Sequence, residues 1–337
     1  MSREKNSRSA KAGSTASLLA KRRPPVNARI LPHPNPLPAR EGRGGGESQA
    51  APGAPVVFLN GRLVPQAAAT VSVFDRGFLY GDGLFETIRV YGGRPFRWGQ
   101  HCERLRRGAE FLKIHLPYSP GELGWFAQRL IERNQLPESL LRITLSRGVG
   151  PRGYSPIGAD SPTLVMMMHP APPVDPQNPP RWRLVTSSFR VPAKERLAAF
   201  KSCNKLAQIL ARAEAGAVGA DEALLLNTDG EIAEAASSNL FWLEGGTVCT
   251  TPLSAGILAG VTRALVLELC ATLSLPCREK RLKPAALKKV SGVFVTLSTL
   301  EVVEITRLDG FPLRRSKHVG LIRRAYREAV RRGMSGD

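Results

Sequence analysis

The sequence contains no hydrophobic run long enough to cross a membrane and no segment typical of a secretory signal. Its 337 residues are 42% hydrophobic and 23% charged, as in ordinary globular proteins. A bilayer-spanning helix needs roughly 20 mostly apolar residues, and a secretory signal needs an apolar stretch near the N-terminus. We therefore expect a cytoplasmic protein with no membrane partner.

Cysteine and histidine are scarce and scattered. Each occurs five times, no two cysteines form a C-x-x-C pair, and the histidines are spread from His33 to His318. Zinc sites and disulfide frameworks both need such residues at characteristic spacings. The sequence therefore predicts neither a metal centre nor disulfide bonds. The cysteines are Cys102, Cys203, Cys249, Cys270 and Cys277.

Aromatic residues are also few, at 6%, although the net charge of +20 raises the question of nucleic-acid binding. Basic proteins attract phosphates, but gripping single strands also needs aromatic side chains among the basic ones. Much of the charge lies at the two ends. Residues 1–53 contain ten Lys/Arg against three Glu, and residues 314–332 contain eight Lys/Arg. We interpret these as a solvated tail and the outer face of a helix, and expect no nucleic-acid partner.

Composition divides the chain into four parts. Residues 1–53 are rich in Ser, Arg, Pro and Gly and bury too little apolar surface to offset the entropy of ordering, so we expect a disordered tail. Residues 169–180 contain six prolines, which indicates a linker. We therefore predict a small α/β domain over residues 54–168 and a larger one over residues 181–333.

Strand and helix signals alternate along both expected domains. Asn60-Gly61, between two apolar runs, predicts a two-residue hairpin turn. Interleaved strands, hairpins and helices predict a mixed α/β (α+β) fold and not a doubly wound parallel sheet. Further strands are expected near residues 84–91, 140–146, 163–168, 182–187, 222–226, 238–243, 247–250 and 292–297, and helices near 98–113, 120–135, 205–218, 261–273 and 318–330.

Lys201 lies in the segment Phe200–Leu206, just before the helical pattern that follows. A lysine gains chemical use when burial or a nearby cation lowers its pKa, because the neutral amine then forms a Schiff base. Most lysines are simply solvated, and this chain has 48 Lys and Arg. The surroundings of Lys201 must therefore decide its role.

Three candidate groups follow Lys201 along the chain. Glu234 ends a predicted strand among small residues, where a carboxylate can accept a hydrogen bond from a protonated ring nitrogen. Residues 256–263 form a glycine-flanked loop leading into a helix, and helix N-termini bind phosphate. Ser298-Thr299 follows an apolar strand and offers hydroxyl and amide donors. Each has an ordinary structural explanation alone, but together they match the needs of pyridoxal phosphate.

The order of these segments resembles the fold-type IV pyridoxal-phosphate enzymes, which include branched-chain and D-amino-acid aminotransferases and aminodeoxychorismate lyase. The resemblance covers residues from about 56 to 313. It implies a two-domain fold like that of D-amino-acid aminotransferase, with the cofactor pyridoxal 5′-phosphate in the cleft and a homodimer as the usual assembly. The matching segments are Asp75–Glu86, His101–Leu105, Lys201–Leu206, Glu234–Phe241 and Gly256–Arg263.

The resemblance also implies roles for individual residues. Lys201 would carry the cofactor and act in catalysis, and Glu234 would pair with the pyridine nitrogen. The phosphate would be bound by an arginine, which is a permanently charged bidentate donor, and by the two groups of amide and hydroxyl donors. The residues expected around the phosphate are Arg104, Val261, Thr262, Ser298 and Thr299.

Two features favour the lyase within this family. Lys205 stands where the aminotransferases usually have a tyrosine, and residues 146–155 resemble a loop of the lyase. We therefore expect a lyase that forms 4-aminobenzoate for folate biosynthesis, with Tyr80, Arg152 and Lys205 as candidate substrate contacts. A branched-chain or D-amino-acid aminotransferase is the alternative. Two departures remain: residues 298–301 lack the lyase's asparagine, and Lys205 leaves the contact to the cofactor's phenolic oxygen unassigned.

Overall fold

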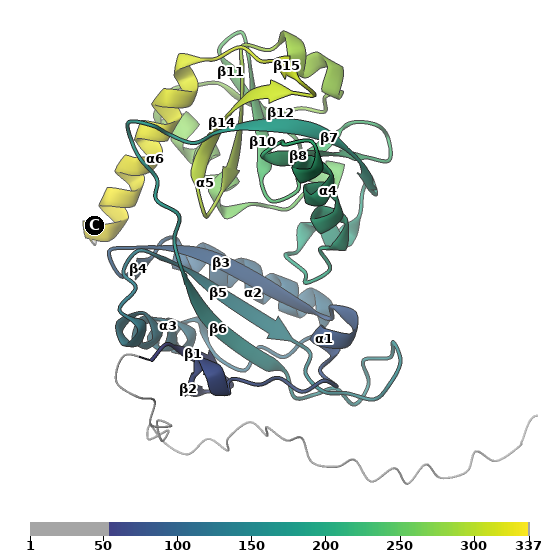
Figure 1. Ribbon diagram of the computed structural model, residues 1–337, viewed down its shortest axis with the longest axis vertical. Helices are drawn as coiled ribbons and strands as arrows, with labels where there is room; N and C mark the ends of the chain where they lie inside the picture. Colours follow the sequence, from purple (N-terminus) through teal and green to yellow (C-terminus); the bar gives the residue numbers. More distant parts are fainter. Residues whose placement is uncertain (1–53, 336–337) are drawn as a thin grey trace, which may run out of the picture. The chain divides into compact units, whose positions relative to one another are not determined.

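The computed structural model describes residues 54–335 (Figure 1). The tail expected over residues 1–53 lies outside these described residues. The described chain contains two β-sheets, and the segment between β6 and β7 leads from the first sheet to the second (Figure 1). The mixed α/β fold predicted from the sequence is confirmed. The domain boundaries stay a prediction, although β6 ends at Pro170 and β7 begins at Arg181, close to the expected linker.

The first sheet is antiparallel throughout, with the strand order β2-β1-β6-β5-β3-β4. Helix α2 packs on β3, and α3 packs on β1 and β6, which encloses one apolar core. The elements are β1 (Val56–Leu59), β2 (Arg62–Pro65), α1 (Arg76–Tyr80), β3 (Gly83–Tyr91), β4 (Arg94–Pro95), α2 (Trp98–Leu112), α3 (Pro120–Asn134), β5 (Ser139–Ser146) and β6 (Thr163–Pro170).

Local sequence explains where these elements turn and begin. Asn60 and Gly61 both have positive φ, as the predicted hairpin turn requires. Helix α3 begins at a capping box, in which the Ser119 hydroxyl and the Glu122 carboxylate each bond the other residue's backbone N–H, with Pro120 in the first turn. These local signals are the reason that the predicted boundaries fall close to the observed ones.

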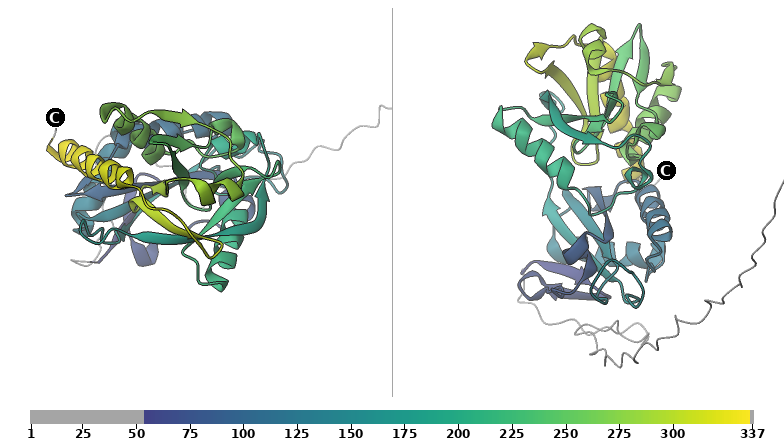
Figure 2. Two further views of the ribbon diagram at one scale, coloured as in Figure 1. Left: turned by 90° about the horizontal axis from the view of Figure 1, so that it is seen from above. Right: turned by 90° about the vertical axis from the view of Figure 1, so that its right-hand side faces the viewer.

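The second sheet has nine strands and a mixed pattern, with the order β12-β11-β10-β13-β14-β7-β8-β9 and β15 paired to β14. Strand β7 runs parallel to β8 and β14, and β11 runs parallel to β12. Helix α4 packs on β7 and β8, and α6 packs on β14 (Figures 1 and 2). Helix α5 packs on β13. The elements are β7 (Arg181–Val191), α4 (Leu206–Ala217), β8 (Glu222–Asn227), β9 (Ile232–Ala235), β10 (Asn239–Glu244), β11 (Thr247–Thr250), α5 (Val261–Thr272), β12 (Cys277–Glu279), β13 (Gly292–Leu297), β14 (Glu301–Leu308), β15 (Phe311–Pro312) and α6 (Lys317–Ser335).

The central strands of this sheet are buried on both faces. In β10, Leu240 and Trp242 belong to one apolar cluster, while Phe241 and Leu243 belong to another. Such strands have nearly continuous apolar sequences, and this made them recognisable. The sequence patterns missed α1, β12, β14 and β15. No helix within residues 54–335 is long and apolar enough to span a membrane.

Candidate functional site

Lys201 lies in an extended segment between the short 3₁₀ helix Arg196–Ala199 and α4. The segment is attached to β3 of the first sheet. The Phe85 N–H donates to the Lys201 carbonyl over 2.9 Å, and the Cys203 N–H donates to the Gly83 carbonyl over 2.9 Å. The predicted position of Lys201, before the helix, is therefore confirmed, and the lysine's backbone is fixed by strand-like hydrogen bonds.

The Lys201 side chain points into a partly buried, electropositive site. Its Nζ lies 4.6 Å from the centre of the Phe85 ring. Burial and, next in size, the charge of Arg104 lower the pKa of Lys201 to about 8, while the carboxylates of Glu86 and Glu234 oppose the shift. A substantial fraction of the amine is therefore neutral near physiological pH, as a nucleophile or proton acceptor requires.

Arg104 of α2 is held by a buried carboxylate. Its Nε and Nη2 donate to the two carboxylate oxygens of Glu86 over 2.7 and 2.6 Å, and its Nη1 donates to the Ala259 carbonyl over 3.0 Å. His101, one turn earlier, contacts Glu86 Oε2 through Nδ1 at 2.7 Å. Arg104 thereby connects the first sheet to the glycine-flanked loop of the second.

Sequence patterns predicted no role for Glu86, although it lies in this site. Burial alone raises the pKa of Glu86, but the charge and hydrogen bonds of Arg104 and the bond from His101 outweigh it, so that the pKa falls to about 2. The carboxylate is therefore an anion at all physiological pH values. Its signal was available as the single acid of the mostly apolar strand Leu84–Tyr91, since a buried acid needs a charged partner.

Replacement of Glu86 by glutamine should lower the free energy of unfolding by about 3 kcal/mol, because it leaves the positive charge of Arg104 buried without its anion. Chemical denaturation at pH 7 measures this. The difference should shrink in acid, because the low pKa of Glu86 contributes stability that is present above the unfolded pKa of 4.5 and is lost as the pH falls towards 2. Glu110→Gln, an exposed partner of Arg106 on the same helix, is the control and should change stability by less than about 0.5 kcal/mol.

Glu234 lies on β9 and is held by its neighbours through one oxygen only. Oε2 accepts from Asn239 Nδ2 over 2.9 Å and from the Leu258 N–H over 3.1 Å. Within residues 54–335, Oε1 accepts no hydrogen bond. Burial raises the pKa of Glu234 to about 7, and the Leu258 N–H and the charges of Lys205, Lys201 and Arg104 act against that rise. The second oxygen is thus available to a cationic partner, which would stabilise the ionised form.

The glycine-flanked loop is fitted closely to Asn239. Asn239 Nδ2 also donates to the Leu258 carbonyl over 2.9 Å, and a Cβ on Gly260 would lie 2.0 Å from Asn239 Oδ1. Gly260 therefore cannot carry a side chain. Helix α5 begins directly after it, with buried Val261 and Thr262 in the first turn. The Thr262 and Ser298 hydroxyl oxygens lie 3.5 Å apart, which places Thr262 beside the Ser298-Thr299 turn.

The structure separates the three candidate substrate contacts. Lys205 is partly buried and electrostatically coupled to Glu234 and Arg104, and burial lowers its pKa. Arg152 is exposed in the loop after β5. The Tyr80 hydroxyl accepts from the Gly153 N–H over 3.1 Å, so it is attached to that same loop. Lys205 therefore joins the Lys201 site, whereas Arg152 and Tyr80 group together; all three remain predictions as substrate contacts.

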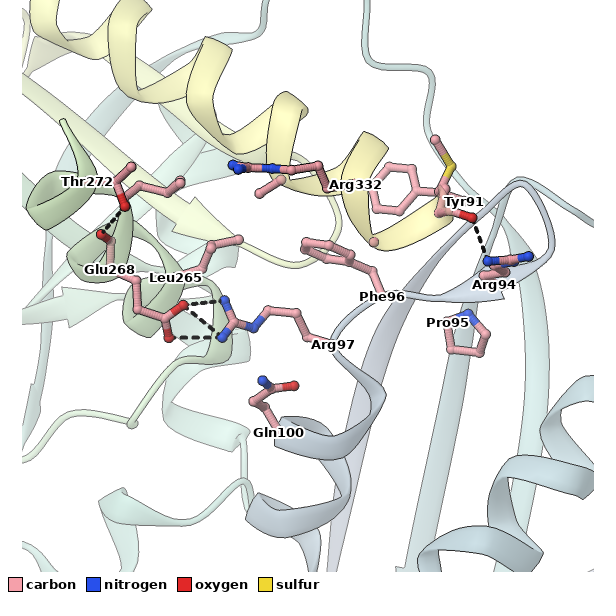
Figure 3. A pocket seen from close by; sticks show the side chains of 14 residues that line it. Tyr91, Arg94, Pro95, Phe96, Arg97, Gln100, Leu265, Glu268, Thr272 and Arg332 are labelled. Carbon is pink, nitrogen blue, oxygen red and sulfur yellow. Dashed lines mark hydrogen bonds and ion pairs between the residues drawn. The ribbon is translucent and has the colours of Figure 1, made fainter. Parts of the chain in front are cut away.

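A cavity of about 500 Å³ lies elsewhere, between the start of α2 and the helices α5 and α6 (Figure 3). None of the predicted site residues lines it. Arg97 is paired through both terminal nitrogens with Glu268, and Arg94 donates to the Met334 carbonyl (Figure 3). Arg97 therefore links the start of α2 to α5, and Arg94 links β4 to α6. We interpret the cavity as part of the contact between the half of the chain that contains the first sheet and the half that contains the second.

Comparisons with known proteins show the family to which the chain belongs. The chain matches the family described as Amino-transferase class IV over residues 83–308. It is 34% identical to a Methanocaldococcus jannaschii protein that bears the name of a branched-chain-amino-acid aminotransferase, over 81% of this chain and 94% of that protein. It is 31% identical to the aminodeoxychorismate lyase of Bacillus subtilis, over 75% of this chain and 87% of that protein.

A solved structure of a similar protein contains a derivative of pyridoxal phosphate. A branched-chain amino acid aminotransferase complexed with N-(5′-phosphopyridoxyl)-L-glutamate superimposes with a TM-score of 0.75 at 29% identity, covering 82% of this chain and 94% of that one. The residues present here fit pyridoxal phosphate. Within residues 54–335, the Lys201 amine and Glu234 Oε1 have no protein hydrogen-bond partner, although both lie in the site and carry perturbed pKa values.

Proposed function

The chain belongs to the Amino-transferase class IV family, whose members use pyridoxal phosphate, and from that premise we propose that it is a 4-amino-4-deoxychorismate lyase. The reaction removes the enolpyruvyl group of aminodeoxychorismate as pyruvate and leaves 4-aminobenzoate, a precursor of folate. It needs a cofactor that binds the substrate's amine, a base for one C–H proton, and a proton for the leaving oxygen. No second substrate takes part.

Lys201 is the proposed attachment point and the proposed base. The bound cofactor supplies an electron sink for the electron pair released when the C–H bond beside the substrate nitrogen breaks. Lys201 Nζ, whose lowered pKa of about 8 keeps a fraction of it neutral near physiological pH, takes that proton. The same amine then returns a proton to the enolpyruvyl oxygen as the C–O bond breaks and the ring becomes aromatic.

Glu234 and the phosphate groups would hold the cofactor in place. The free Oε1 of Glu234 would pair with the protonated pyridine nitrogen, while Oε2 stays fixed by Asn239 and Leu258. The first turn of α5, with Val261 and Thr262, would bind the phosphate together with Ser298, Thr299 and Arg104. Arg104 keeps hydrogen atoms free for this purpose on Nη1 and Nη2, because each terminal nitrogen uses one in its present bonds.

The observation that carries the lyase proposal is Lys205. It brings a second amine beside Lys201 and Glu234, at the position where the family's aminotransferases usually have a tyrosine hydroxyl. Aminodeoxychorismate carries two carboxylates, and a partly buried cation is suited to binding one of them. The side chain of a branched-chain amino acid is apolar and offers no second carboxylate to this charge.

The direct test is the substrate. Purified holoenzyme would receive enzymatically made aminodeoxychorismate without any 2-oxo acid, and in parallel L-leucine or D-alanine with 2-oxoglutarate. The proposal predicts equal amounts of pyruvate and 4-aminobenzoate in the first reaction. Glutamate formed in the second reaction, with no products in the first, would show that the proposal is wrong.

An aminotransferase acting on branched-chain or D-amino acids is the second candidate. It is favoured by the 34% identity to the archaeal protein named above and by the 31% identity to a D-alanine aminotransferase of Staphylococcus aureus, over 81% of this chain and 95% of that protein. This alternative would use the same Lys201, Glu234 and phosphate groups. It differs after the C–H bond breaks. No oxygen leaves the substrate, and the enzyme keeps the amino group until it passes it to a 2-oxo acid.

Lys205→Tyr should separate the two activities. Loss of the cation should raise the KM for aminodeoxychorismate about 10- to 100-fold, since a charge-assisted hydrogen bond contributes roughly 1.5–3 kcal/mol. Steady-state kinetics of pyruvate release measure this. Lys283→Met, which removes an exposed lysine before the 3₁₀ helix Pro284–Lys289, is the control and should leave the KM unchanged. A KM for the Lys205 variant within about twofold of the wild type would contradict the role of Lys205.

We also propose that the chain forms a homodimer. Large apolar side chains are exposed in two groups. One group lies around α1 and the neighbouring loop after β5, and the other lies along α4. Exposed apolar patches of this kind mark protein interfaces. The first group is Phe78 on α1, Phe74 just before it, and Tyr154 and Ile157 in the loop; the second is Leu206 and Ile209 on α4 with Val218 directly after it.

Light scattering coupled to gel filtration should give twice the chain mass, and Phe78→Glu should shift the protein towards the monomer. Phe78 is 74% exposed in the single chain, so its replacement alters no core packing within the protomer. Trp125→Glu, at a 55% exposed aromatic outside both groups, is the control and should remain dimeric. A wild-type monomer at micromolar concentration would contradict the homodimer.

A further inference from the structure

The turn at residues 298–300 is followed by a residue in an unfavourable backbone conformation. The turn joins β13 to β14, and Leu297 pairs with Glu301 across the hairpin. Glu301 has a φ of +64°, in the left-handed region that glycine adopts most easily. A non-glycine residue keeps such a conformation where its surroundings hold it, and such residues gather at functional sites. The contacts of Glu301 are therefore informative.

Glu301 is held by two side chains from distant elements, the buried Tyr91 and the half-buried Arg327. It is 4% exposed, its Oε1 accepts from the Tyr91 hydroxyl over 3.0 Å, and its Oε2 lies 3.3 Å from Arg327 Nε. Tyr91 belongs to β3 of the first sheet and Arg327 to α6. The carboxylate thus fixes the end of the turn to both the first sheet and the C-terminal helix.

Arg89 holds the turn from the same strand as Tyr91. The side chain is buried, and its Nη1 donates to the Thr299 carbonyl over 3.2 Å and to the Pro172 carbonyl over 3.0 Å. The Thr299 carbonyl shares a peptide plane with the Leu300 N–H, so the bond to Arg89 also fixes the direction of that N–H. Within residues 54–335, the N–H groups of Thr299 and Leu300 donate to no protein acceptor. The turn therefore presents two oriented donors, which suit an anion.

The first turn of α5, the second element assigned to the phosphate, contacts the same buried side chains as Glu301. Tyr326 of α6 is 1% exposed, shares a buried cluster with Tyr91, and lies beside the Thr262 and Glu301 side chains. The first turn of α5 and the turn at 298–300 are thus joined through Tyr91, Tyr326 and Glu301. Because the two elements are linked in this way, their spacing is set by side chains that do not themselves face the site.

We propose that Arg89 and Glu301 are positioning residues that hold the turn at 298–300 in the geometry that binds the cofactor's phosphate. The proposal rests on the phosphate role assigned above to Thr262, Ser298 and Thr299. It predicts an effect specific to the phosphate, because Arg89 and Glu301 act through the turn, on the side of the site that meets the phosphate and not the ring.

The test compares the affinities of the cofactor-free protein for pyridoxal phosphate and for pyridoxal, which lacks the phosphate, by absorbance titration. Arg89→Met should raise the Kd for pyridoxal phosphate about tenfold or more while changing the Kd for pyridoxal by less than about twofold. Arg89→Lys should restore most of the affinity, because an amine can still donate to the Thr299 carbonyl. Glu301→Gly, which fits the backbone conformation but removes the attachment, should show the same selective loss.

Arg323→Met is the matched control. Arg323 donates from Nε to the carbonyl of Val302, the residue after Glu301 on β14, over 3.2 Å. This bond resembles that of Arg89 but does not involve the turn at 298–300. Its loss should leave the ratio of the two affinities unchanged. Equal weakening of both ligands by Arg89→Met and Glu301→Gly, or no weakening, overturns the proposal. Thr262→Val distinguishes a failure of the positioning role from a failure of the phosphate assignment on which it rests. A selective loss there without one at Arg89 rejects the positioning role alone, whereas no selective loss at Thr262 rejects the phosphate assignment itself.

Discussion

Replacement of Lys201 by alanine should abolish turnover, with a fall in kcat of at least about 10⁴-fold, because one amine supplies both the cofactor attachment and the proton transfer. The absorbance band of the attached cofactor should disappear in the same variant. Steady-state kinetics and a spectrum of the purified protein measure the two effects. Lys201→Arg keeps the charge but supplies no neutral amine, and should be equally inactive.

The control is Lys205→Ala, which should keep the absorbance band because Lys205 is not the attachment point. A band that persists in Lys201→Ala would contradict the assignment. Stability offers an independent check in the cofactor-free protein. Burial lowers the pKa of Lys201 from 10.5 to about 8, so its charged form is less stable in the folded protein than in the unfolded chain. Lys201→Met should therefore stabilise the protein below pH 8, and the gain should vanish as the pH rises towards 10.5.

Glu234→Gln should lower kcat by about 10²- to 10⁴-fold while the cofactor remains attached to Lys201. A neutral amide cannot stabilise a protonated pyridine nitrogen as an anion does, so the cofactor becomes a weaker electron sink. The matched control is Glu231→Gln, which removes a carboxylate paired with Arg281 just before the same strand and should retain full activity. A Glu234→Gln variant with wild-type kcat would show that this carboxylate does not face the ring nitrogen.

The pH dependence of stability tests the burial of Glu234 separately. Burial raises the pKa of Glu234 from 4.5 to about 7 in the cofactor-free protein, so its ionised form is disfavoured by folding. The resulting cost is fully present above pH 7 and absent below pH 4.5. Denaturation of the cofactor-free Glu234→Gln variant should accordingly show a gain over the wild type at pH 8 that disappears near pH 4.5.

The fold was predictable to the extent that local signals determine it. The Asn60-Gly61 turn, the capping box at Ser119 and the apolar runs of β8 and β13 each produce the element that the sequence indicates. Strand β14 was missed because it begins with Glu301 and contains Glu304, two buried acids whose partners include Tyr91 and Arg181, far away in the chain. Sequence periodicity contains no information about such partners.

The site was predictable where residue type and local setting agree. Lys201 before a helix and a glycine loop before α5 could be identified from the sequence, and the structure brings Lys201, Glu234, Arg104 and Lys205 into one electrostatic group. Glu86 could not be assigned, because its role comes from the pairing of β3 with α2. Arg89 likewise depends on a contact between residues 210 positions apart in the chain.

The central claim is that Lys201, and not its neighbour Lys205, carries the cofactor. Borohydride reduction of the holoenzyme, followed by proteolysis and tandem mass spectrometry, tests it most directly, because reduction makes the link permanent. The account predicts a phosphopyridoxyl group on Lys201 and an unmodified Lys205 in the same peptide. A label on Lys205, or on any other lysine with Lys201 unmodified, would contradict it.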